Sequence, residues 1–260
     1  MNETHQAGGK KDYVTNISGD AGDLYKEPFL LDRSQKFNVY SLFGQIENEF
    51  NILEGMRTVM GLRIDRGDFD LTTTEKRSYS QTSPRLGIVQ KVTNSLNLKL
   101  LYSTAYRSPT IKDVGINAES ANDMIDSSKI KDISPESLTS FEIGLSYNTD
   151  KIALNTTFFS NVTKDALNGK QITDSDSKKY NVVQNSLGQT ISKGVEVELK
   201  TVLTKKLTLT LNYSMADSEA IDEDDNVTGL NDVATARYNI ILGYKNNDQT
   251  YNIISRNVEG

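Results

Sequence analysis

Apolar and polar residues alternate along most of this chain with a period of two. Leu96, Leu98 and Leu100, for example, are interleaved with Asn97 and Lys99. Because successive side chains of a strand point to opposite faces, such a run has one apolar face and one polar face. The pattern predicts an all-β protein with strands over 37–52, 57–69, 82–92, 96–107, 138–147, 151–162, 190–203, 206–215 and 234–245, and a tenth strand that begins near Thr250.

The connections between these strands are alternately short and long. Short connections fall at 53–55, 93–95, 148–150, 204–205 and 246–248, and long polar stretches at 66–80, 108–136, 164–189 and 216–233. Tight turns at one end and long loops at the other are typical of an up-and-down antiparallel β-barrel in an outer membrane. A soluble β-sandwich shows the same alternation, but it has no reason to place every tight turn at one end, so we keep it as the alternative.

Two stretches show no strand pattern. Residues 1–35 are mostly polar and rich in Gly, so we expect them to be loop-like. Residues 116–130 contain tolerable helix formers, but their composition favours a solvated loop over a helix.

The composition narrows the class of protein further. The net charge is −6 and the pI is near 5.0, so no basic stripe is available for nucleic acid. The mean hydropathy is −0.50, and no apolar run approaches the roughly 20 residues of a membrane helix. A barrel strand needs only every second residue to be apolar, so a membrane location is still open. Trp is absent, and the residues that could form an aromatic girdle instead are Tyr40, Tyr102, Tyr147, Tyr213, Tyr238 and Tyr244.

Side chains for catalysis or for a resident metal are scarce. The chain has one histidine, His5, and no cysteine, which leaves no parts for Ser-His or Cys-His catalysis or for a zinc site. We therefore expect neither an enzyme nor a cofactor. The acidic stretch 217–225 has the oxygen ligands that calcium prefers. However, Val227 occupies the turn position where an EF-hand needs Gly, so a solvated loop is favoured.

Several short motifs carry a family resemblance. The best is Ala105-Tyr106-Arg107-Ser108-Pro109-Thr110, which is similar to a "G/A-F/Y-R-A/S-P-T" signature. In order along the chain, the other motifs are Gly61-Leu62-Arg63-Ile64-Asp65, Ser83-Pro84-Arg85-Leu86-Gly87, Ile133-Ser134-Pro135-Glu136-Ser137, Ser140-Phe141-Glu142-Ile143-Gly144-Leu145 and Ile191-Ser192-Lys193-Gly194-Val195-Glu196-Val197-Glu198. In this order and spacing, they resemble the C-terminal barrel half of TonB-dependent outer-membrane receptors.

The resemblance implies a barrel of about 22 strands closed by an N-terminal plug, of which this chain supplies about ten strands. We expect residues 1–260 to be a partial barrel without the plug, monomeric and located in the outer membrane. By resemblance, the function is energy-dependent uptake of a siderophore, cobalamin, haem or glycan. The implied partners are membrane lipid, a small-molecule ligand such as a metal chelate or glycan and, in the full-length protein only, the TonB complex. The alternative is a non-transport barrel or soluble β-sandwich that acts as a surface-binding or adhesion module.

The motif residues have structural interpretations. Arg107 and Pro109 end a strand, since proline has no N–H to donate to the ladder. Gly194 inside an alternating strand suggests a bulge or a close packing partner. Glu196 and Glu198 share the polar face, and we interpret them as part of a wetted wall. The full structural set is Arg63, Arg85, Arg107, Pro109, Glu136, Glu142, Gly194 and Glu196, and the ligand-contact candidates in the loop 108–136 are Lys112, Lys129 and Lys131.

Overall fold

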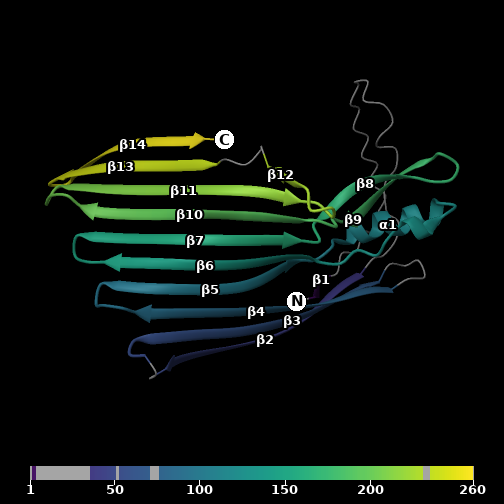
Figure 1. The fold of residues 1–260 in the computed structure, drawn as a ribbon, viewed down its shortest axis with the longest axis horizontal. Coiled ribbons are helices and arrows are strands. Elements are labelled where there is room, and N and C mark those ends of the chain that lie inside the picture. The colour runs from purple at the N-terminus through teal and green to yellow at the C-terminus, as the bar shows by residue number, and fades with distance from the viewer. Residues whose placement is uncertain (1, 4–35, 51–52, 71–75, 231–234, 260) are drawn as a thin grey trace.

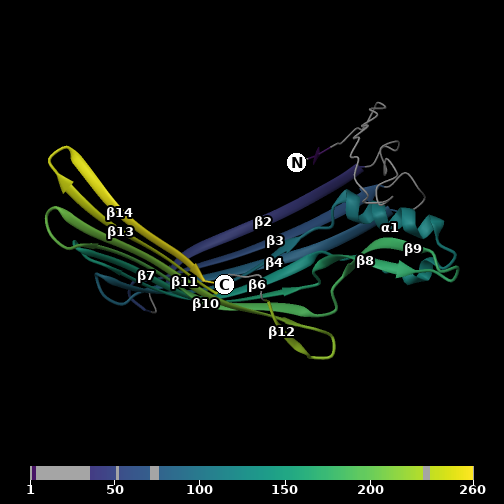
Figure 2. The same ribbon diagram turned by 90° about the horizontal axis from the view of Figure 1, so that it is seen from above.

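One antiparallel sheet dominates the computed structural model, which describes residues 2–3, 36–50, 53–70, 76–230 and 235–259 (Figure 1). Its strands pair in chain order with two exceptions: β8 and β9 form a separate hairpin between β7 and β10, and β12 pairs only with β11. The ten long strands are β2 (Lys36–Phe50), β3 (Met56–Asp70), β4 (Lys76–Lys91), β5 (Leu96–Arg107), β6 (Glu136–Asn148), β7 (Ile152–Lys164), β10 (Gln189–Val202), β11 (Leu207–Ile221), β13 (Ala236–Asn246) and β14 (Gln249–Glu259). The sheet is bent into an open trough, as Figure 2 shows.

The apolar face of this sheet is not covered by a second layer. Leu42, Ile143 and Phe158 are 73%, 48% and 57% exposed. The register places Ile143 between Leu100 and Phe158, so these side chains form a continuous apolar band. An apolar band of this kind suits hydrocarbon rather than water. The partial barrel sheet is therefore confirmed, and the soluble-sandwich alternative is wrong.

The short connections lie together at one end of the sheet (Figure 1). Three of them have the same internal bond. The hydroxyls of Thr93, Thr149 and Thr204 each accept a hydrogen bond from the backbone N–H three residues later, at 3.0–3.1 Å. Threonine favours such turns because its short side chain reaches the neighbouring backbone.

The opposite end is more structured than the sequence predicts. Residues 66–80 are mostly strand, because β3 continues to Asp70 and β4 begins at Lys76. The predicted loop 164–189 contains a hairpin of β8 (Leu167–Thr173) and β9 (Lys179–Asn185), and β12 (Val227–Gly229) pairs with β11.

The preference for a loop over a helix at 116–130 is wrong. This stretch contains most of α1 (Ile111–Asp123) and the short 3-10 helix η1 (Ser127–Lys129). Packing against two other parts of the chain, described below, outweighs the weak helix propensity. Among the described residues no helix is long and apolar enough to cross a membrane. Of the predicted loop 1–35, only β1 (Asn2–Glu3), paired with β2, lies within the described residues.

Candidate ligand-capture mouth

The helix α1 begins at a strong start signal. Thr110 is the N-cap: its hydroxyl accepts from the Asp113 N–H at 3.2 Å, and the Asp113 carboxylate accepts from the Thr110 N–H at 2.9 Å. This reciprocal capping box satisfies donors that a helix start otherwise leaves unpaired. Pro109, one of the sequence-derived candidates, is fully buried just before the cap. Proline has a fixed φ angle and no backbone N–H, so it ends the strand pairing of β5 and leads directly into the helix.

One face of α1 packs on an aromatic cluster at the loop end of the sheet. Phe69 of β3 is 3% exposed and stacks on Phe37 of β2, with ring centroids 4.4 Å apart. Val114 of α1 is 1% exposed in the same cluster. The partly buried residues around this core include Tyr79, Ile111, Ala118 and Ile133. The sheet therefore has a small water-excluded core at this end, in contrast to its exposed apolar face.

An adjacent face of α1 binds the β8–β9 hairpin through hydrogen bonds to its backbone. The Asn117 side chain is fully buried, donates to the Val183 carbonyl at 2.8 Å and accepts from the Val183 N–H at 2.7 Å. The Ser120 hydroxyl donates to the Asn181 carbonyl at 3.0 Å. We call α1, η1, β8 and β9 together the α1–hairpin assembly.

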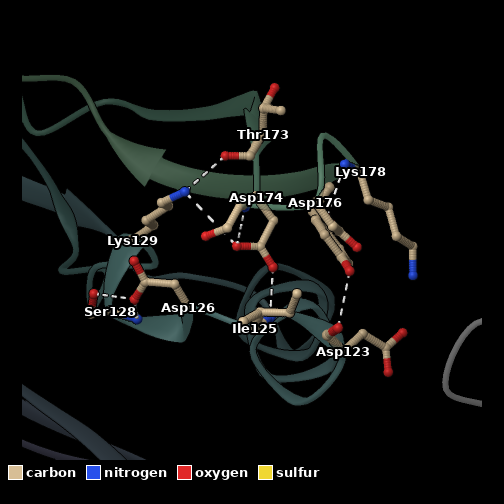
Figure 3. Close-up of polar contacts among 11 residues, drawn as sticks. Asp123, Ile125, Asp126, Ser128, Lys129, Thr173, Asp174, Asp176 and Lys178 are labelled. Atoms are coloured by element: carbon tan, nitrogen blue, oxygen red, sulfur yellow. Dashed lines mark hydrogen bonds and ion pairs between the residues drawn. The ribbon is translucent and has the colours of Figure 1, made fainter.

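The far end of this assembly is held by the buried carboxylate of Asp174 (Figure 3). One oxygen accepts from the Ile125 N–H at 2.6 Å and the other from the Ser175 N–H at 2.7 Å. Burial alone raises the pKa of Asp174, but these backbone N–H groups, that of Asp126 and the Lys129 ammonium outweigh burial and hold the pKa below its usual value. The carboxylate therefore stays ionised at neutral pH and ties the segment after α1 to the end of β8.

Lys129 belongs to the same cluster. Its ammonium group donates to the Thr173 carbonyl at 3.0 Å and lies 3.8 Å from the Asp174 carboxylate. Figure 3 shows this side chain directed at the end of β8. Lys129 is thus engaged within the protein. Lys112 and Lys131 differ from it, since both are exposed and have no polar contact in the described part of the chain.

At the base of the long loops, Arg107 and Glu136 form an ion pair. The distance is 2.7 Å, and the two residues are directly opposite in the β5–β6 register. Glu136 also accepts from the Leu167 N–H at 3.3 Å. Asn185 at the end of β9 bonds to Ser134. These bonds therefore join the end of β5, the start of β6 and both ends of the β8–β9 hairpin at one place.

The polar face of the sheet carries the other motif residues. Arg63 grips the buried Asp65 carboxylate, with Nε to Oδ2 at 2.8 Å, and Ser41 donates to the same carboxylate at 2.5 Å. Arg85 bonds to Gln45 and passes over Gly61, where an added Cβ would lie only 2.5 Å from the Arg85 Nε. On this face, the Arg63–Asp65 contact lies within β3, Ser41 joins β2 to β3, and Arg85 reaches from β4 across β3 to β2. Glu142 has a weaker contact, a 3.3 Å bond from the Ser140 hydroxyl.

Gly194 lies in an uninterrupted part of β10. The strand pairs residue by residue with both β7 and β11, so there is no bulge at this position. The close partners are instead the Met215 carbonyl oxygen and the Phe159 ring, which would lie 2.2 Å and 2.6 Å from an added Cβ. Beside it, Glu196 and Glu198 line a hollow of about 440 Å³ on the face opposite the apolar band, together with Asn212, Arg237 and Arg256. This face therefore carries charged side chains of both signs.

Calcium binding by the acidic stretch gains no support from the geometry. The Asp222 carboxylate accepts from the side chain and backbone of Asn226 and from the Asp224 N–H, which lowers its pKa and closes a turn. Within the described ranges, no group of three or more His, Cys, Asp or Glu residues is arranged to hold a metal ion.

Sequence analysis missed the residues that organise the mouth, which is our name for the loop end of the sheet together with the α1–hairpin assembly. Asn117, Asp174 and Phe69 are buried, yet none belongs to a recognised motif. One usable signal was present, because Thr110 and Asp113 stand at the spacing of a capping box. Nothing local marks Asn117, whose partner is 66 residues away.

An open antiparallel sheet with an exposed apolar face, a wet concave face and long loops at one end defines a wall of an outer-membrane β-barrel. Residues 3–257 match the family model "TonB dependent receptor-like, beta-barrel", and the chain belongs to this family. No curated protein matches the sequence.

Solved structures support the same fold. The copper transporter OprC has a TM-score of 0.66 and 17% identity, with 85% of this chain and 35% of that chain covered. The FrpB iron transporter from Neisseria meningitidis (F3-3 variant) has a TM-score of 0.63 and 19% identity, with coverage of 86% and 33%. The ferripyoverdine receptor of Pseudomonas aeruginosa has a TM-score of 0.64 and 12% identity, with coverage of 85% and 28%. The chain thus spans about a third of these proteins, and its location is the outer membrane.

Proposed function

We propose that this chain forms part of the barrel of a receptor that captures a scarce small-molecule nutrient and imports it with energy from the TonB complex. The observation that carries the proposal is the position of the α1–hairpin assembly at the loop end of a wetted trough (Figure 2). A ligand that binds the assembly would meet a polar wall leading toward the short-turn end. Solved structures of the same fold include transporters of copper and iron and a receptor for ferripyoverdine.

The ligand class we favour is an anionic metal chelate. Lys112 and Lys131 are exposed near the mouth and engage no polar partner in the described ranges, so both ammonium groups are available. An exposed ammonium attracts anions over about one Debye length, which at physiological ionic strength is about 8 Å. Motif residues such as Arg107 and Glu136 are paired with each other and have a structural role in this proposal.

Uptake by cells tests the proposal. The full-length receptor is expressed in a strain that lacks its own uptake receptors, and radioactive iron is supplied as a ferric catecholate, as a ferric hydroxamate or as haem. We expect one of these probes to accumulate, and accumulation to stop when the TonB complex is deleted. No accumulation of any probe, or accumulation that is unchanged without the TonB complex, would contradict energy-dependent import of an iron chelate.

A charge-removal series locates the contact. Replacing both Lys112 and Lys131 by Ala should weaken binding of the transported chelate severalfold while leaving the amount of folded receptor unchanged. Lys205→Ala is the matched control, since it removes the same charge from an exposed position at the opposite end of the sheet. Equal effects of the mouth and control substitutions would show that only the net charge matters.

A further inference from the structure

The outer edge of β9 is satisfied by side chains rather than by another strand. β9 pairs with β8 alone, so every second residue of β9 directs its backbone groups away from the hairpin. Asn117 takes both groups of Val183, and Ser120 takes the carbonyl of Asn181. An open edge is a risk for a protein because it invites another strand. Here the side-chain amide of Asn117 takes the place of a neighbouring strand at Val183.

The same helix reaches a second, distant part of the wall. Val114 packs in the cluster of Phe69 on β3, whereas the hairpin that holds Asn117 is inserted between β7 and β10. Both views place α1 at the loop end of the sheet, beside β8 and β9 (Figures 1 and 2). A helix of 13 residues thereby links two regions of the barrel rim that share no strand pairing.

We propose that Asn117 is the positioning residue that joins α1 and the β8–β9 hairpin into one rigid body, so that the connections 108–135 and 165–188 move together. Asn117 is fully buried and both of its hydrogen bonds end on Val183, itself 7% exposed. Without the amide, a buried N–H and a buried C=O would both lack a partner, which would loosen the centre of the interface while the hydroxyls of Ser120 and Tyr180 still bond across it. The consequence for capture rests on the proposed function: the ligand meets a preassembled surface instead of two independent loops.

Distance measurements between spin labels test the coupling directly. These 260 residues contain no cysteine, so Lys112→Cys on α1 and Lys179→Cys on β9 give two exposed labelling sites, and any cysteine elsewhere in the full-length receptor is replaced by serine. In the full-length receptor in detergent micelles, we expect one narrow distance distribution. Asn117→Leu, which is similar in size but has no polar atoms, should broaden it at least twofold. Asn168→Leu on β8 is the matched control, since it makes the same chemical change at an exposed position whose side chain has no hydrogen bond in the described part, and it should leave the distribution narrow.

Hydrogen exchange of the Val183 amide gives an independent readout. We expect Asn117→Leu to raise its exchange rate roughly tenfold or more, as expected when two hydrogen bonds are lost, and Asn168→Leu to leave it unchanged. If Asn117→Leu does not fold, as judged by the strand signal in circular dichroism, Asn117→Asp replaces it. Aspartate keeps the acceptor for the Val183 N–H but sets an acceptor against the carbonyl, and the same broadening is expected.

Three results would overturn the proposal. The first is a broad distribution in the unsubstituted receptor, and the second is a narrow distribution with a protected Val183 amide in the Asn117 variant. The third is equal broadening by Asn168→Leu, which would show that the hairpin responds to any such change. Neither measurement uses a ligand, so a failure here is separate from a failure of the uptake experiment.

Discussion

The ten-strand wall and the α1–hairpin assembly belong to one chain but are stabilised in different ways. In the wall, hydrogen bonds run from strand to strand and large apolar side chains such as Leu42 and Phe158 stay exposed. In the assembly, Val114, Val182 and Met124 are buried, and side chains such as Asn117 and Asp174 bond to the backbone. A strand facing hydrocarbon needs only the right alternation, whereas a structure standing in water needs a core of its own.

The difference has a consequence for substitutions. In the wall, the face on which a residue lies should decide how much stability a substitution costs. The same substitution at two neighbouring residues should therefore have different effects. In the assembly, burial and hydrogen bonding of the individual side chain should decide it. The following four tests compare the two regions, from the largest expected effect to the smallest.

Phe69→Ala should have the largest effect. It removes a side chain that is 3% exposed from the aromatic cluster under α1, and large-to-small changes of this kind cost about 3–5 kcal/mol. Hydrogen exchange should accelerate in α1 and at the loop ends of β2 and β3. Phe43→Ala is the control, because Phe43 is 76% exposed on β2 and its removal leaves no cavity. Equal protection in the two variants would rule out a core at this end.

Leu211→Arg should follow, and it tests the wall. Leu211 lies between Leu199 and Ile240 on the apolar face. A charge placed there should cost about 2–4 kcal/mol at the bilayer midplane. Thr210→Arg places the same charge one residue away on the wet face and should cost little. Denaturant unfolding of both variants in lipid vesicles measures the difference, and a larger loss for Thr210→Arg would reverse our assignment of the faces.

Thr110→Ala should have a smaller effect, confined to the start of α1. The substitution removes the capping hydroxyl, which typically contributes about 1 kcal/mol. Faster exchange of the first-turn amides of α1 is the expected readout. Thr110→Ser retains the hydroxyl and should preserve slow exchange, so a serine variant as labile as the alanine variant would point to loss of the methyl group instead.

The smallest effect should appear only in acid. Because the pKa of Asp174 is lowered in the folded state, its carboxylate stabilises the assembly above the unfolded pKa, near 4, and this contribution is lost as pH falls through the folded pKa. Exchange of the Ile125 amide should therefore accelerate below about pH 4. In Asp174→Asn it should be fast already at neutral pH and change little on acidification. A native protein with no acid response would show that this carboxylate does not hold the segment.

The wall could be predicted from the sequence because its rule is local. Alternation set which face of each strand is apolar, and all ten long strands were anticipated. Some of their ends were not: β4 starts at Lys76, six residues before the predicted start, because a ladder can continue beyond the membrane with polar residues. Past that point, hydrophobicity no longer distinguishes strand from loop.

The mouth could not be predicted because its contacts are long-range. Asn117 and Val183 are 66 residues apart, and Ile125 and Asp174 are 49 apart. Residues 167–185 lack the apolar alternation of the wall, and their hairpin is stabilised by α1 rather than by its own pattern. In sequence, Asp174 resembles any other polar residue of a loop. Only the fold shows that it is buried and that Lys129 is engaged beside it.

The threonine turns at the short-connection end bear on how such walls change during evolution. Each hairpin that contains Thr93, Thr149 or Thr204 closes through a bond within its own turn. Such a two-strand unit closes its own turn, and single backbone bonds, such as that from the Asn148 N–H to the Ser95 carbonyl, join it to the next hairpin at that end. Gene duplication or deletion can therefore add or remove hairpins as modules, widening or narrowing the pore in steps of two strands.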